Sequence, residues 1–284
     1  MKELEGGVAV VTGAGSGIGR ALAERLGAAG MRVVASDVDA TALHETLTQL
    51  EQRGVPTRGV VADVSSADDV QRLAEATLDT FGGVHVLCNN AGVFAGGLCW
   101  EAPLSDYEWV WGVNTWGVLH GIRSFVPILL EQGQPAHVVN VASMAAVTSG
   151  PLSAAYFMSK HAVLALSESL VHELRMKGAP IGVSVVCPEL VATRIGDAER
   201  NRPKHLERGD GPLPAETRSV EAAIRTATRT GVPPATIAQR TLEAILEDRF
   251  YVLAPKGDPW RMACDRRARD LLLARNPSIP GPAS

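Results

Sequence analysis

The stretch Val8-Ala9-Val10-Val11-Thr12-Gly13-Ala14-Gly15-Ser16-Gly17-Ile18-Gly19 decides the fold. It joins a run of β-branched residues to a glycine-rich turn, and an amphipathic helical pattern follows over about residues 17–29. Glycine lets the chain turn sharply and lets backbone N–H groups approach a phosphate. A glycine-rich string alone is common, but strand, turn and helix in this order predict binding of a dinucleotide. The predicted contacts are Thr12, Gly13, Gly15, Ser16, Gly17, Ile18 and Gly19.

Short apolar runs alternate with helical patterns along most of the chain. Strands are predicted over residues 8–11, 32–35, 58–62, 84–88, 137–141, 182–187 and 250–253. Strands that are apolar on both faces and alternate with helices indicate a parallel sheet covered on both sides. With right-handed crossovers this is a doubly wound α/β fold of the Rossmann type. No linker-like stretch divides residues 1–275, so they are predicted to form a single domain.

Two segments depart from this pattern. Residues 189–234 are rich in charge, Gly and Pro and predict short helical stretches at best. Because they follow a strand end where ligands bind in such sheets, they are a candidate substrate lid; a mobile surface insertion is the alternative. Residues 276–284 contain three prolines in nine positions and are predicted to be a disordered tail.

Composition excludes several classes of protein. The 27 Lys and Arg and 31 Asp and Glu are interspersed and give a net charge of -4, which argues against nucleic-acid or membrane partners. With no long apolar run and a charged N-terminus, the chain is expected to be soluble and cytoplasmic. Four dispersed cysteines are expected to be buried apolar residues, with no metal site. They are Cys88, Cys99, Cys187 and Cys264.

Asp37 ends the second predicted strand, where the adenosine ribose of a dinucleotide would lie. A carboxylate there can accept hydrogen bonds from both ribose hydroxyls and would repel a 2'-phosphate by about 4 kcal/mol at contact distance. Because the turn from Gly13 to Gly19 contains no Arg or Lys, NAD is favoured over NADP. A helix cap or turn residue is the alternative reading of Asp37.

Tyr156 and Lys160 are four residues apart at the start of a long helical pattern, which puts both on one helix face. A free tyrosine has a pKa near 10, so a general base at neutral pH needs that pKa lowered by about two to three units. A lysine cation at about 4 Å can supply this, and the positive nicotinamide would add to it. A solvated lysine on an amphipathic helix is the alternative.

Further polar residues stand at predicted strand ends. Ser143 follows the strand that ends at Val141 and could donate a hydrogen bond to a substrate carbonyl. Asn114 lies in a helix predicted over about residues 106–130, where an amide is unfavourable if buried. A proton relay through water to Lys160 would explain it; an ordinary, partly exposed Asn is the alternative. Asn90, Ala91 and Gly92 are expected beside the cofactor, and Asp63 and Val64 beside its adenine.

In this order, these motifs resemble the single-domain branch of the short-chain dehydrogenase/reductase family over residues 8–193. The resemblance implies hydride transfer between NAD(H) and a secondary alcohol or ketone. Tyr156 would be the general acid/base, Ser143 the oxygen-positioning residue, Lys160 the pKa-lowering ribose ligand and Asn114 the relay. Pro188, Val191 and Thr193 would complete the cofactor contacts.

Two departures from the family pattern bear on function. Glu189 follows Pro188 where the family usually has glycine, and it is expected either to contact a polar substrate group or to face solvent. The ending, with a charged helix over about residues 259–275, looks like that of a bacterial subgroup that oxidises benzylic alcohols of lignin-derived aryl ethers. Arg194 and Asn201-Arg202-Pro203 add to this likeness.

Apolar residues in the predicted loops favour an apolar or aromatic substrate, with ordinary core packing as the alternative. They are Val93, Phe94, Leu98, Met144, Ala145, Val147, Leu152 and Leu190. A homodimer or homotetramer with Trp109 or Trp116 buried between subunits is also predicted. An NADP-dependent biosynthetic ketoreductase is the alternative enzyme, and a non-catalytic NAD sensor is the alternative outside enzymes.

Overall fold

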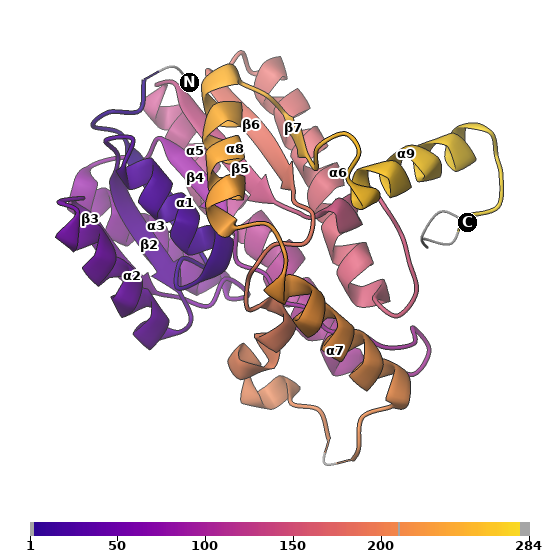
Figure 1. Cartoon of the computed structure of the whole chain (residues 1–284). Coiled ribbons are helices and arrows are strands. Elements are labelled where there is room, and N and C mark those ends of the chain that lie inside the picture. Colours follow the sequence, from indigo (N-terminus) through magenta and orange to yellow (C-terminus); the bar gives the residue numbers. More distant parts are fainter. Residues whose placement is uncertain (1–2, 210, 279–284) are drawn as a thin grey trace.

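The computed structural model describes residues 3–209 and 211–278, and a seven-stranded parallel sheet forms its centre (Figure 1). The strand order is β3-β2-β1-β4-β5-β6-β7. The chain adds β2 and β3 on one side of β1 and then returns to add β4 and the later strands on the other, so the strand order reverses between β1 and β4. This is the doubly wound Rossmann fold expected from the sequence, and each predicted strand is found within two residues of its expected ends. The strands are β1 (Val8–Thr12), β2 (Arg32–Asp37), β3 (Thr57–Val61), β4 (Val86–Asn89), β5 (Ala136–Val141), β6 (Ile181–Cys187) and β7 (Tyr251–Leu253).

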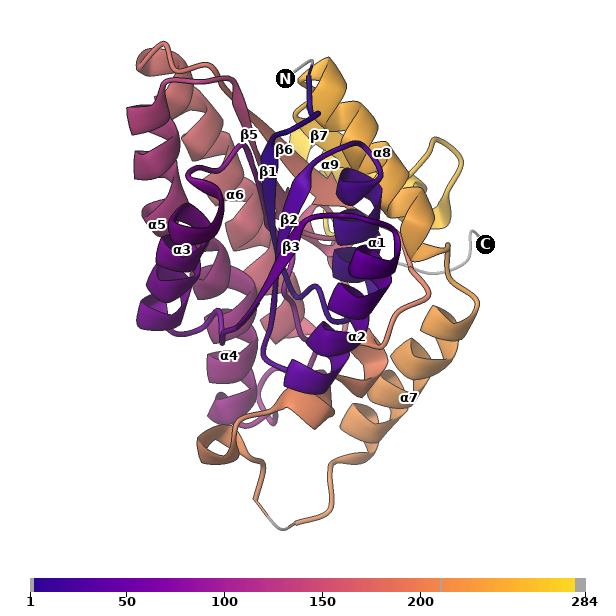
Figure 2. The ribbon, with the colours of Figure 1, turned by 90° about the vertical axis from the view of Figure 1, so that its left-hand side faces the viewer.

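Helices cover both faces of the sheet. Viewed along it, α1, α2 and α8 lie on one side and α3, α5 and α6 on the other (Figure 2). Helices α4 and α7 lie beyond one end of the sheet (Figure 2), and α9 projects from the body (Figure 1). Their bounds are α1 (Gly17–Gly27), α2 (Ala40–Gln52), α3 (Ala67–Phe81), α4 (Leu104–Trp111), α5 (Gly117–Gln132), α6 (Ala154–Met176), α7 (Ala215–Arg229), α8 (Pro234–Glu247) and α9 (Pro259–Leu272).

Strand β1 shows why the strands are apolar throughout. All five of its residues are buried, and successive side chains point to opposite faces. Val11 belongs to the core cluster that contains Leu22 of α1, whereas Val10 belongs to the cluster that contains Phe125 of α5. Each face therefore needs its own apolar residues, which produces an unbroken apolar run instead of an alternating pattern.

The long helix predicted over residues 106–130 is found, but it is not uniform. Helices α4 and α5 join through a π-helical segment, η1 (Gly112–Trp116), which contains Asn114. Trp109 is buried within the chain, in a cluster with Val93. Of the two tryptophans predicted at a subunit interface, Trp116, 48% exposed, is the one whose surface remains available.

The candidate lid is more ordered than the sequence predicted. Residues 215–229 form the 15-residue helix α7, so the expectation of short helical stretches at best is wrong there. The prolines and glycines that suggested irregular structure lie outside this helix. Two short 3₁₀ segments, η3 (Ile195–Asn201) and η4 (Lys204–Leu206), precede it.

Buried ion pairs attach the candidate lid to α4. Asp106 accepts hydrogen bonds from Arg202 Nη2 at 2.7 Å and from Arg208 Nε at 2.8 Å. The Asp106 and Arg202 side chains are only 2% and 3% exposed, and the Arg202 guanidinium lies 4.2 Å from the centroid of the Trp109 ring. Glu221 of α7 accepts from Arg208 as well. The segment is therefore fastened at both its 3₁₀ part and its long helix.

The cysteine prediction is only partly correct. Cys88 and Cys187 are buried, but Cys99 is exposed and Cys264 is half-buried because it lies on the projecting α9. Among the described residues, no helix is long and apolar enough to cross a membrane. The predicted tail lies mostly outside the described residues, since residues 279–284 are not described.

Candidate active site

The glycine turn has the shape that a diphosphate cradle requires. Gly13 and Gly17 have φ angles of +64° and +55°, a region that favours glycine. A Cβ on Gly19 would lie 2.0 Å from the carbonyl oxygen of Gly13, so no side chain fits at that position. Ser16 precedes α1 without making a side-chain cap, which leaves the N–H groups of the first turn to other acceptors. These features fit an anion such as a nicotinamide dinucleotide diphosphate.

Asp37 lies at the end of β2 and lines the cavity beside this turn. Its Oδ2 accepts the N–H of Gly15 at 2.8 Å, and its Oδ1 accepts the N–H of Asp39 at 2.9 Å. Asp39, not Asp37, caps α2. Asp37 is therefore a turn residue, which was the alternative reading, and it also lines the cavity, so its contact with the ribose stays a prediction.

Thr12 and Asn90 connect the loops that follow β1 and β4. Thr12 Oγ1 accepts the N–H of Asn90 at 3.0 Å, and Asn90 Nδ2 donates to the carbonyl of Thr12 at 2.8 Å. These strands flank the point at which the strand order reverses, where ligands bind in open α/β sheets. Asp63 and Val64 border the same cavity from the end of β3.

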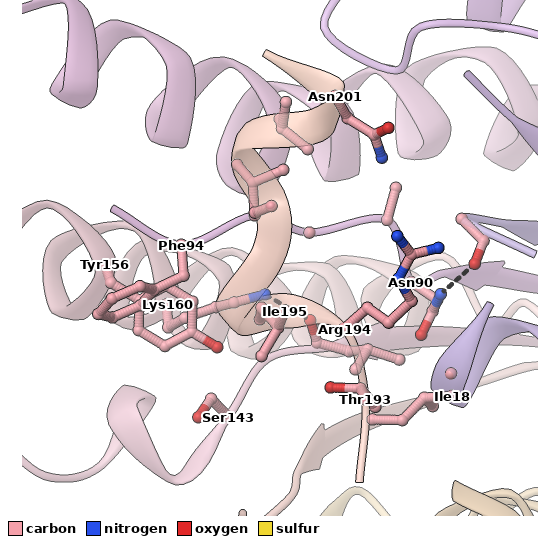
Figure 3. A pocket seen from close by; sticks show the side chains of 18 of the residues that line it. Ile18, Asn90, Phe94, Ser143, Tyr156, Lys160, Thr193, Arg194, Ile195 and Asn201 are labelled. Atoms are coloured by element: carbon pink, nitrogen blue, oxygen red, sulfur yellow. Dashed lines mark hydrogen bonds between the residues drawn. The ribbon is translucent and has the colours of Figure 1, made fainter. Parts of the chain in front are cut away.

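Three of the four side chains predicted to be catalytic, Ser143, Tyr156 and Lys160, meet at the end of the cavity away from the glycine turn. Tyr156 and Lys160 project from the first turns of α6, and the Ser143 hydroxyl faces that of Tyr156 (Figure 3). Ser143 Oγ accepts the N–H of Ala145 at 3.1 Å, which leaves its O–H to donate elsewhere. Lys160 Nζ lies 5.7 Å from the Tyr156 ring centroid and donates to the carbonyl of Val141 at 3.0 Å.

Burial dominates the electrostatics of this cluster. It raises the pKa of Tyr156 to about 12, and the hydrogen bond with Ser143 acts in the opposite direction. Burial lowers the pKa of Lys160 to about 8. Both groups lose hydration, and each therefore favours its neutral form. A lower Tyr156 pKa, brought about by the Lys160 cation together with a positive nicotinamide, stays a prediction.

Asn114 lies next to this cluster but does not line the cavity. It is fully buried in the π-helical segment. Its Nδ2 donates to the carbonyl of Val93 and to Ser159 Oγ, both at 3.0 Å, and its Oδ1 accepts the N–H of Val93 at 2.8 Å. A Cβ on Gly92 would lie 3.4 Å from Asn114 Oδ1 and 3.5 Å from Lys160 Nζ, so the amide and the ammonium approach the same point.

The residues after β6 form one wall of the cavity. Pro188, Val191 and Thr193 all line it, and a Cβ on Gly17 would touch Thr193 Cγ2 at 2.9 Å. Glu189 does not face solvent: its side chain is 8% exposed and its Oε1 accepts from Arg240 Nη1 at 2.7 Å. Arg194 extends toward Asn90 across the cavity (Figure 3).

The apolar part of the cavity surrounds Tyr156. The Phe94 ring packs edge-on against the Tyr156 ring, with centroids 5.3 Å apart. Of the eight apolar residues predicted to line the substrate site, five do so, whereas Leu98, Val147 and Leu152 do not. The five are Val93, Phe94, Met144, Ala145 and Leu190.

Some contacts in this cavity were not predicted. Trp260 reaches it from the first turn of α9, and Trp109, Ile195, Ala198 and Leu206 add apolar surface. An Asp258 cap and Pro259 mark the start of α9, but only the pairing of β7 with β6 brings that helix beside the cavity. Three predicted cofactor contacts belong to the glycine turn but do not line the cavity. They are Thr12, Gly15 and Gly19.

The described residues contain no group of three or more His, Cys, Asp or Glu side chains able to hold a metal ion. The predicted cofactor contacts that do line the cavity come from the carboxyl ends of β1, β2, β3, β4 and β6 and from the start of α6. They are Gly13, Ser16, Gly17, Ile18, Asp37, Asp63, Val64, Asn90, Ala91, Gly92, Tyr156, Lys160, Pro188, Val191 and Thr193.

Comparison with known proteins agrees with this geometry. Residues 7–204 match the family model described as short chain dehydrogenase. The chain belongs to the short-chain dehydrogenase family. A crystal structure of a family member from Burkholderia phymatum in complex with NAD is 45% identical, with a TM-score of 0.95 and coverage of 100% of both chains.

Two characterised relatives also match most of this short-chain dehydrogenase. The 1-deoxy-11-beta-hydroxypentalenate dehydrogenase of Streptomyces arenae is 39% identical over 258 residues, which cover 89% of this chain and 84% of that protein. The C alpha-dehydrogenase of Sphingobium sp. (strain NBRC 103272 / SYK-6) is 30% identical over 254 residues, which cover 89% and 82%. The family expected from the motifs is therefore confirmed.

Proposed function

We propose that the protein transfers a hydride between NAD(H) and a secondary alcohol or ketone with an apolar or aromatic body. The observation that carries this proposal is one cavity with Ser143, Tyr156 and Lys160 at one end and Ile18 of the glycine turn at the other. Asp37 lines the same cavity and accepts the N–H of Gly15 in that turn. A dinucleotide has the length to connect two such ends. The NAD bound to the Burkholderia phymatum relative supports the choice of cofactor.

Bound NAD⁺ would supply the hydride acceptor and a positive charge close to the phenol. In alcohol oxidation, Tyr156 Oη takes the proton of the substrate hydroxyl, and Ser143 donates a hydrogen bond to the same oxygen. Lys160 favours the phenolate, and Asn114 relays the proton to solvent through water near Gly92. Ketone reduction reverses each proton movement.

The substrate class is inferred from the cavity wall. Phe94, Met144, Leu190 and Trp260 offer apolar surface in the cavity that Tyr156 lines, and the Phe94 ring packs against the Tyr156 ring. Residues 189–234, fastened to α4 through Asp106, serve as the lid over this surface. Such a site favours an aromatic or alicyclic alcohol over a sugar phosphate.

The test is a panel of aromatic, alicyclic and aliphatic secondary alcohols, and their ketones, assayed by absorbance of the reduced cofactor with NAD⁺ and NADP⁺ in parallel. We expect turnover of aromatic or alicyclic compounds and a preference for NAD⁺. Cofactor binding without turnover of any compound would instead support a sensor. A preference for NADP⁺ would support a biosynthetic ketoreductase.

A further inference from the structure

One carboxylate oxygen in the cavity wall has no hydrogen-bond partner within the described part of the chain. Glu189 lines the cavity, and its side chain is 8% exposed. Its Oε1 pairs with Arg240 Nη1 at 2.7 Å, whereas its Oε2 is fully buried and unpaired. Buried carboxylate oxygens are normally hydrogen-bonded, and an N–H group of a bound ligand is a candidate donor for this one.

The position of Arg240 indicates from which side Glu189 approaches the cavity. Arg240 belongs to α8, which lies on the same face of the sheet as α1, the helix that begins at the glycine turn (Figure 2). Tyr156 and Lys160 belong to α6, on the opposite face. Glu189 thus borders the cavity from the face of the sheet that α1 and α8 cover.

The neighbours of Glu189 in the sequence indicate which part of the ligand it would meet. Pro188 and Val191, on either side of it, line the cavity after β6 and are predicted cofactor contacts. So does Thr193, the residue expected at the carboxamide of the nicotinamide ring. The carboxamide of that ring carries two N–H donors, and a carboxylate oxygen is a pure acceptor. Arg240 holds the other oxygen, so Oε2 is kept in one place.

We propose that Glu189 Oε2 accepts a hydrogen bond from the carboxamide N–H of the nicotinamide, and that the Glu189–Arg240 pair thereby orients the ring. This inference rests on the proposed function, because it assumes a nicotinamide dinucleotide in the cavity. It assigns a cofactor-binding role to the position at which the chain departs from the glycine of its family.

The experiment compares two dinucleotides, one with the nicotinamide carboxamide and one without it. Dissociation constants of NAD⁺ and of 3-acetylpyridine adenine dinucleotide, whose acetyl group lacks N–H donors, are measured by calorimetric titration. They are measured for the unmodified protein, for Glu189→Ala, and for Glu243→Ala, a control that removes an exposed carboxylate from α8. We expect Glu189→Ala to weaken NAD⁺ binding about tenfold, as loss of one charge-assisted hydrogen bond would, and to leave the analogue within twofold.

Other results would overturn the inference in distinguishable ways. Equal weakening for both dinucleotides would indicate a general loosening of the site. Unchanged NAD⁺ binding with a raised KM for the alcohol would put the donor on the substrate, and no change in either quantity would mean that Oε2 is satisfied by water. If the unmodified protein binds neither dinucleotide, the proposed function itself fails. Should Glu189→Ala not fold, Glu189→Gln offers the same comparison, because a single amide oxygen cannot serve both Arg240 and the carboxamide.

Discussion

Asn114 holds Val93 by two hydrogen bonds at once: its Oδ1 accepts the Val93 N–H at 2.8 Å and its Nδ2 donates to the Val93 carbonyl at 3.0 Å. A single buried amide thus clamps the loop that follows β4. Ser159 Oγ accepts the second amide N–H of Asn114 at 3.0 Å, so both N–H groups of the amide are hydrogen-bonded. The relay proposed for Asn114 therefore depends on atoms other than its amide hydrogens.

Replacing Asn114 by Ala should destabilise the protein and slow turnover. The change leaves two buried backbone groups of Val93 unpaired, at about 1–3 kcal/mol for each. We expect a lower urea midpoint and a kcat reduced at least tenfold, because Gly92 and Val93 border the site. Ser159→Ala removes one partner and keeps the clamp, so it should have the smaller effect. Equal effects of the two variants would contradict the clamp.

Tyr156→Phe should abolish most turnover while NADH still binds. The Tyr156 phenolate is the proposed proton acceptor in alcohol oxidation, and a positioned acid/base contributes about 10²–10⁴-fold to a rate. Fluorescence titration of NADH and steady-state kinetics measure the two properties separately. Tyr107→Phe is the matched control, because the Tyr107 hydroxyl donates to the carbonyl of Cys99 outside the cavity. A normal kcat in Tyr156→Phe would show that Tyr156 is not the general acid/base.

The sequence predicted features that depend on neighbouring residues, and it missed those that depend on which strands pair. Strand β1 is buried on both faces, which requires consecutive apolar residues, so its unbroken apolar run predicted the strand from the sequence. The distance from Tyr156 to Lys160 follows from helix geometry alone. In contrast, Glu189 meets Arg240 and Trp260 reaches the cavity only because α8 and β7 pack beside β6. Local spacing contains no information about those approaches.

Charge removal at Asp37 should relax the cofactor preference. Asp37→Asn keeps an acceptor for the Gly15 N–H but removes the negative charge, whose repulsion of a 2'-phosphate is about 4 kcal/mol at contact distance before screening. We expect the ratio of kcat/KM for NAD⁺ to that for NADP⁺ to fall at least tenfold. Asp39→Asn is the control at the neighbouring helix cap. If both variants change the ratio equally, the effect is not specific to the ribose site.

Asp106→Asn should loosen the candidate lid. The Asp106 carboxylate pairs with two buried guanidiniums, and breaking a buried ion pair by removing one partner costs about 3–5 kcal/mol. We therefore expect a clearly lower melting temperature and a higher KM for the alcohol. Asp197→Asn breaks the pair with Arg225, whose partners are 48% and 47% exposed, and should change stability by about 0–1 kcal/mol. Similar melting temperatures for the two variants would show that the buried pairs do not hold the segment.

Acid should destabilise the protein partly through His137, which is buried in β5. Burial lowers the pKa of His137 from 6.5 to about 3. Ser184 Oγ donates to the carbonyl of Arg249, so it must accept the Nε2–H of a neutral His137 at 2.8 Å. Between these two pKa values the unfolded chain binds the extra proton, so the free energy of unfolding falls by up to about 1.4 kcal/mol for each pH unit lost.

Urea denaturation at a series of pH values between about 7 and 4 tests this contribution, with the window set by the reference and lowered pKa values of His137. His137→Gln keeps a donor for Ser184 and has no proton to gain. We expect the pH slope of its unfolding free energy to be smaller than that of the unmodified protein, whereas His44→Gln, at an exposed position of α2, should keep the full slope. Because the carboxylates are common to all three proteins, the difference in slope isolates the histidine. Identical slopes for the unmodified protein and His137→Gln would mean that His137 binds a proton in the folded state as readily as in the unfolded chain.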